Sequence, residues 1–125
     1  MAKVTLDFRK LILSADIFPT RAGEQFIKGL PYKNIPLTTW GHEAYGSIDA
    51  IIDPVNPQPT IPSGGLAYSK KGSYLCIFYG QVPAWPVEYI GQVEGDSWLP
   101  LKGSGVELLD VTLASFAISD NLTPG

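Results

Sequence analysis

Hydrophobic and polar residues alternate along the first part of the chain, as they do in a strand with one buried face. Val4, Leu6 and Phe8 are separated by polar residues, and after two basic residues the alternation resumes at Leu11. The interruption marks a turn between two strands. Residues 3–17 are therefore predicted to form a hairpin.

The next segment has helical spacing. Ala22 and Phe26 lie four residues apart, with Thr20 before them and Pro31 after them. A threonine at the N-cap accepts a hydrogen bond from a free N–H group of the first turn, and a proline cannot continue a helix. We predict one short helix over residues 20–30, covering one end of the β-structure.

Strand-like runs return beyond residue 31, separated by turns rich in glycine and proline. The predicted strands are 35–40, 43–52, 66–68, 73–79, 87–93 and 108–116. Residues 74–79 are apolar on both faces, which is typical of a central strand covered from both sides. Four prolines within residues 54–62 lack the N–H donor that a sheet needs, so this segment is predicted to be an extended loop. We expect residues 117–125 to be a loose tail.

Composition favours a single, mostly β domain. A chain of 125 residues suits one domain with a real core, and its apolar fraction of 45% is ordinary for a globular protein. The 13 glycines and 11 prolines fall between the apolar runs, and neither a repeat nor a linker divides the chain. The sequence therefore predicts one domain over residues 1–125, a closed or nearly closed barrel of about eight strands with one short helix.

Charge, hydrophobic runs and cysteine content indicate which partners and which location to expect. Nine basic and twelve acidic residues give a net charge of −3 without any basic run, so we expect no nucleic-acid partner. No run approaches the roughly 18 apolar residues of a membrane span, and the first residues lack the apolar core of a signal peptide. Cys76 is the only cysteine, so no internal disulfide can form and a cytoplasmic location is expected.

Four stretches resemble, in order, motifs of the small bacterial and archaeal cyclophilin-like proteins, a family of uncharacterised proteins with a cyclophilin-like β-barrel. They are Pro19-Thr20-Arg21-Ala22 with Leu30-Pro31, Thr39–Tyr45 with its Trp-Gly-x-Glu-x-Tyr pattern, Gly64–Tyr68 with Leu75–Gly80, and Tyr89–Gly95. The resemblance covers residues 3–115 and implies the barrel fold. Gly65 stands where the family usually has aspartate, and residues 69–72 replace Trp-Pro-Pro-Gly. Both changes fall on turns, so we expect them to alter one rim of the barrel and not the fold.

Because of this resemblance, prolyl isomerisation, the activity of true cyclophilins, has to be considered. Those enzymes use the arginine of a Phe-His-Arg motif to assist a rotation whose barrier is about 18–20 kcal/mol. This chain has only Arg9 and Arg21, neither in such a motif, and residues 75–79 lack the expected glutamine. We expect no efficient isomerase activity. Two alternatives remain open: a weak isomerase or peptide-binding chaperone that reuses the groove, and a structural subunit that forms homo-oligomers through the loop holding Trp85.

Few side chains of catalytic type are present. His42 and Glu43 are adjacent, so on a strand they point to opposite faces and cannot bind one metal ion. The sequence has no cluster of three ligands and no phosphate-binding loop, so neither a metal nor a cofactor is expected. Cys76 lies between apolar residues and is interpreted as a buried, inert thiol, the alternative being a nucleophile with His42 as its base.

Aromatic residues give the best indication of a binding site. Several of them lie in the family-like motifs near one carboxylate, Glu43, which shares a strand face with Tyr45 and is interpreted as a partly buried group bonded to a tyrosine hydroxyl. A mostly apolar groove with a few polar groups is typical of ligand sites. The predicted groove is lined by Trp40, Glu43, Tyr45 and Tyr68, with His42 or Trp85 at its rim. The protein is interpreted as a binding module for an unknown small molecule or extended peptide. The competing interpretation is that these aromatic residues only fill the barrel.

Overall fold

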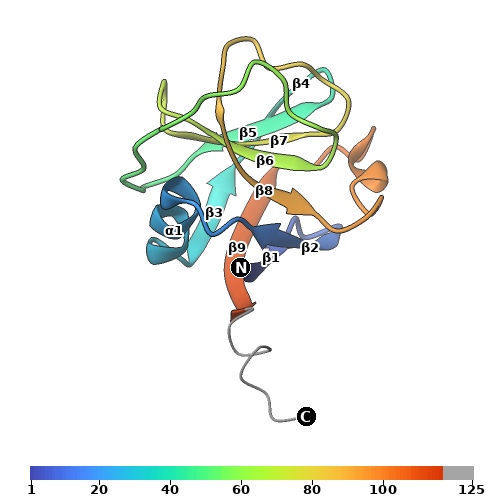
Figure 1. Ribbon diagram of the computed structural model, residues 1–125. Coiled ribbons are helices and arrows are strands. Elements are labelled where there is room, and N and C mark those ends of the chain that lie inside the picture. The colour runs from blue at the N-terminus through green and yellow to red at the C-terminus, as the bar shows by residue number, and fades with distance from the viewer. Residues whose placement is uncertain (117–125) are drawn as a thin grey trace.

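Nine strands form one sheet that curves into a nearly closed barrel (Figure 1). The computed structural model describes residues 1–116, so the tail expected at 117–125 lies outside the described residues. The strands are β1 (Ala2–Asp7), β2 (Ile12–Ile17), β3 (Tyr32–Pro36), β4 (Thr38–Trp40), β5 (Glu43–Ser47), β6 (Gly65–Ser69), β7 (Tyr74–Phe78), β8 (Glu88–Val93) and β9 (Leu108–Phe116). The helical segments of this part of the chain are α1 (Arg21–Lys28) and a short 3-10 turn, η1 (Leu99–Leu101). The prediction of a mostly β barrel with one short helix is confirmed, with one strand more than expected.

The two ends of the sheet are joined by the chain itself. The strand order is β3-β9-β1-β2-β8-β6-β7-β5-β4, so β3 and β4 are the outermost strands, yet a single residue, Leu37, connects them. The run expected as one strand divides at Leu37, where the pairing partner changes: the residues before it pair with β9 and those after it pair with β5. A Cβ atom on Gly46 of β5 would lie 2.5 Å from the carbonyl oxygen of Pro36. Glycine thus permits the close approach of β3 to β5 that nearly closes the barrel.

The first hairpin and the helix form as the sequence predicts. β1 pairs with β2 in antiparallel register, with Val4 opposite Ala15 on the buried face. At the start of α1, the Thr20 hydroxyl accepts a hydrogen bond from the Gly23 N–H at 3.1 Å, as an N-cap should. The helix lies against β2 and β8 and buries Phe26 in the main core.

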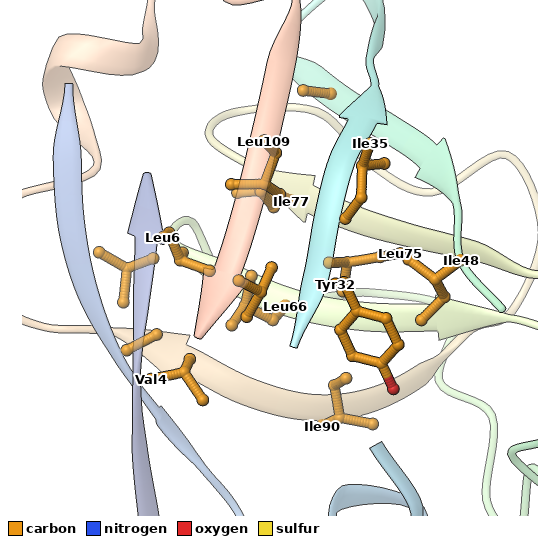
Figure 2. Close-up of a cluster of buried hydrophobic side chains, with 14 of the residues drawn as sticks. Val4, Leu6, Tyr32, Ile35, Ile48, Leu66, Leu75, Ile77, Ile90 and Leu109 are labelled. Atoms are coloured by element: carbon orange, nitrogen blue, oxygen red, sulfur yellow. The ribbon is translucent and has the colours of Figure 1, made fainter. Parts of the chain in front are cut away.

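β7 is a central strand covered on both faces, as expected. Leu75 and Ile77 belong to the main core inside the barrel, together with residues such as Leu66 of β6 (Figure 2). Cys76 and Phe78 point the other way, into a smaller apolar cluster on the outer face of the sheet. Fully burying one such aliphatic or aromatic side chain stabilises the fold by about 1.5–3 kcal/mol. The smaller cluster forms the floor of the candidate site.

The proline-rich segment at residues 54–62 is a loop, as predicted, and it covers the edge of this outer cluster. Its backbone is held by Glu88, whose carboxylate accepts hydrogen bonds from the N–H groups of Val55 and Asn56, both at 2.9 Å. Gln58 also forms an isolated antiparallel bridge with Val87. These bonds fix a segment that has too few N–H donors to pair as a full strand.

Candidate functional site

A half-open cavity of about 440 Å³ lies on the outer face of β5, β6 and β7. Eleven residues line it: Trp40, Glu43, Tyr45, Ser69, Tyr74, Cys76, Phe78, Pro83, Ala84, Trp85 and Val87. β4 to β7 supply the first seven, and the segment 83–87 before β8 supplies the other four. The volume falls within the range of about 300–1,000 Å³ that is typical of small-molecule sites.

Strand register explains why these residues share one face. Glu43 is paired with Phe78, and Tyr45 with Cys76, across β5 and β7. Directly paired residues of antiparallel strands project from the same face, and side chains alternate between faces along each strand. The alternation that places Leu75 in the main core therefore places Glu43, Tyr45, Cys76 and Phe78 in the cavity.

Four of the six residues predicted from the sequence line this cavity, namely Trp40, Glu43, Tyr45 and Trp85. Tyr68 lies on the opposite face: it pairs with Leu75, is buried in the main core, and its hydroxyl lies 2.9 Å from the Ser73 hydroxyl.

His42 also lies outside the cavity lining. It is exposed in the two-residue turn between β4 and β5, where Gly41 has a φ of 61° as such a turn requires. Its ring centroid is 6.1 Å from that of Tyr79. Cys76 and His42 are thus not brought together at the cavity, and the thiol is buried.

Several lining residues were missed by sequence reasoning, notably Ser69, Tyr74 and Phe78. The alternate spacing of Tyr74, Cys76 and Phe78 indicates a common face, but this face is linked to Glu43 only by the pairing of β7 with β5. The pairing partner of a strand is not contained in its own sequence pattern. Tyr74 and Tyr45 meet edge to face with ring centroids 4.9 Å apart, which makes them one continuous wall.

Trp85 forms the wall opposite the sheet. It is 40% exposed, in agreement with the expectation that this residue between prolines reaches the surface. Its indole Nε1–H donates to the Ser69 hydroxyl at 2.9 Å, and the ammonium of Lys71 lies 4.6 Å from its ring centroid. The hydrogen bond ties the loop of residues 83–87 to the end of β6, so the indole is held at a fixed position.

Glu43 is the only acidic or basic side chain among the eleven lining residues. It is 7% exposed, and burial raises the pKa of its carboxyl group, an effect that the neighbouring Cys76 thiol partly offsets. The pKa of the Cys76 thiol is strongly raised. Burial is the main cause, and the nearby Glu43 carboxylate is the second. The hydrogen bond from a tyrosine hydroxyl expected for Glu43 is not among its contacts within residues 1–116.

Residues 1–116 give less support to a metal site or to a site built around an arginine. No three His, Cys, Asp or Glu side chains in this range gather closely enough to hold a metal ion. Arg9 is paired with Asp110 and Arg21 with Asp53, and neither arginine lines the cavity. Neither helical segment in the described range has the length and apolar character needed to span a bilayer.

Comparisons with known proteins agree with this architecture. The model of the family described as "Cyclophilin-like" matches residues 2–106, and the chain belongs to this family. The hypothetical protein AF2241 from Archaeoglobus fulgidus has a similar structure, with a TM-score of 0.73 and 21% identity over 90% of this chain and 95% of that one. McbB, solved in complex with tryptophan, aligns with a TM-score of 0.65 and 17% identity, over 90% of this chain and 44% of McbB. No curated protein matches the sequence. At these identities the two structures show the fold alone.

Proposed function

We propose that this cyclophilin-like domain is a binding module that holds a small molecule in the cavity lined by Trp40, Glu43, Tyr45 and Trp85. The observation that carries the proposal is the composition of the cavity: aromatic walls surround a single buried carboxylate. An apolar pocket with one or a few polar groups that fix orientation is the usual form of a small-molecule site.

Two other hollows have similar volumes but a different character. One, of about 410 Å³, lies beside β3, and another, of about 430 Å³, lies beside α1. Exposed residues such as Lys28, Lys33 and Asp49 make up most of their linings. They are open depressions, whereas the floor of the proposed site is the buried outer cluster around Cys76 and Phe78. Size alone therefore does not favour the proposed site, but its buried apolar floor does.

The structure of one neighbour contains a small molecule. McbB has this fold over the aligned region and its structure was solved in complex with tryptophan. Fold by itself does not determine the ligand, so the proposal rests on the cavity of this protein. Prolyl isomerisation of the cyclophilin type has less support, because the two arginines are engaged in ion pairs away from the cavity.

The test is a small-molecule screen by ligand-observed NMR, followed by affinity measurements on variants. Trp40→Ala and Trp85→Ala each remove a partly exposed wall, so both should weaken the hits at least about tenfold while the protein stays folded. Ile12→Ala is the matched control, because it removes an exposed apolar side chain of β2 away from the cavity. Hits that bind all three variants like the unmodified protein would contradict the proposal.

A further inference from the structure

The carboxylate of Glu43 has no cationic partner among residues 1–116. Six ion pairs are found in this range, and none includes Glu43. Glu88, which is buried to the same degree, accepts two backbone N–H groups. Near Glu43, by contrast, the donor found within residues 1–116 is the weak thiol of Cys76, which also lies 4.0 Å from the Tyr74 carbonyl oxygen. A buried carboxylate normally has a charged or strongly hydrogen-bonding partner. The remaining acceptor capacity of Glu43 faces the cavity.

The walls around this carboxylate are also suited to a cation. Five of the eleven lining residues are aromatic: Trp40, Tyr45, Tyr74, Phe78 and Trp85. Aromatic rings attract ammonium and guanidinium groups over their faces, most strongly where water is excluded. The position of Lys71, with its ammonium 4.6 Å from the ring centroid of Trp85, is an instance of this attraction at the edge of the site.

We infer that the cavity takes a small organic cation, with the ammonium group of the ligand placed between the aromatic walls and the Glu43 carboxylate. The inference rests on the proposed function and specifies the class of ligand. An anion would meet an unpaired negative charge. A neutral ligand could reach the carboxylate only through an uncharged hydrogen-bond donor, which pairs with it more weakly than a cation does. A metal ion would find one carboxylate in place of the three or more protein ligands that a metal site needs.

Choline and its uncharged isostere 3,3-dimethylbutan-1-ol provide the test. The two probes have nearly the same shape, so calorimetric or NMR titration with each measures the effect of the charge alone. The unmodified protein should bind choline at least about tenfold more tightly than the alcohol. The Glu43→Gln variant, which keeps the size of the side chain, should lose most of this preference and keep only the part that the aromatic walls supply. Glu88→Gln is the matched control and should keep the preference for choline, because Glu88 lies outside the cavity lining.

Each outcome decides the inference. A preference for choline that falls markedly in Glu43→Gln and is kept in Glu88→Gln supports it. If the unmodified protein binds the alcohol as tightly as choline or more tightly, the ligand is not a cation. The proposed small-molecule function is not contradicted by that result. A preference for choline that is undiminished in Glu43→Gln also overturns the inference, because the carboxylate would then play no part in recognising the charge. If neither probe binds, the inference fails, and the screen described above decides separately whether the cavity is a ligand site.

Discussion

Replacement of Glu43 by glutamine should stabilise this protein at neutral pH, although it alters a buried residue. Because burial raises the pKa of the Glu43 carboxyl group, the folded state holds a proton more tightly than the unfolded state. The stability that this carboxyl contributes is therefore fully present below the pKa of an unfolded glutamate, about 4.3, and is lost as pH rises through the higher folded pKa. Glutamine is neutral throughout and avoids the loss.

The size of the effect follows from the surroundings of the carboxylate. Leaving a buried polar group without a full set of partners costs about 1–3 kcal/mol. The open cavity beside Glu43 lets water reach it, which favours the lower part of that range. We expect a gain of about 1–2 kcal/mol in the free energy of unfolding at pH 7, or about 4–8 °C in Tm for a domain of this size. The gain should shrink towards zero near pH 4.

Glu88→Gln is the control and should behave in the opposite way. Its carboxylate is 6% exposed and accepts two backbone N–H groups, and a neutral amide oxygen accepts such bonds more weakly. We expect a loss of about 1 kcal/mol. Thermal unfolding of both variants and of the unmodified protein between pH 4 and pH 8 measures the two effects. A Glu43→Gln variant that loses stability at pH 7 as Glu88→Gln does would refute the reasoning, since Glu43 would then be a satisfied structural group.

Three further predictions concern catalysis, the thiol and the core. The protein should not accelerate isomerisation of a proline-containing tetrapeptide, and rates comparable to those of a true cyclophilin would contradict the expectation drawn from the missing arginine. Cys76 should resist alkylation by iodoacetamide until the protein unfolds, because burial raises its pKa strongly; rapid labelling of the folded protein by mass spectrometry would be the opposite result. Burial raises the pKa of Tyr32 to about 12, and its hydroxyl donates to the Phe26 carbonyl at 2.7 Å. Absorbance titration of Tyr32→Phe should therefore lack the tyrosine that ionises near pH 12, and the variant should lose about 1 kcal/mol of stability.

Local patterns were enough to predict most elements of this fold, although the strand expected over residues 43–52 ends at Ser47. The hairpin at residues 3–17, the helix capped by Thr20 and the central strand around Cys76 each follow from period, capping or two-sided hydrophobicity within a short window. The division of residues 32–40 into β3 and β4 was not predicted, because it depends on a change of pairing partner from β9 to β5 that no local pattern contains.

The candidate site was predicted in part, for the same physical reason. Glu43 and Tyr45 were assigned to one face by alternation within a single strand, and the structure agrees. The face on which Tyr68 lies depends instead on the pairing of β6 with β7 and on which side of that pair is inside the barrel. A shift of register by one residue reverses that assignment, and the sequence of β6, buried along its whole length, carries no alternation that would fix it.

The three tryptophans allow the most direct test of the central claim, that the cavity is where the ligand binds. Trp40 and Trp85 line it, whereas Trp98 packs against the main core. The indole N–H signals of ¹⁵N-labelled protein, assigned with Trp→Phe variants, can be followed while the tightest-binding small molecule is added. Binding in the cavity should produce saturable shifts for Trp40 and Trp85 and leave the signal of Trp98 unchanged. Saturable binding that moves only the Trp98 signal, or leaves the Trp40 and Trp85 signals unchanged, would contradict it.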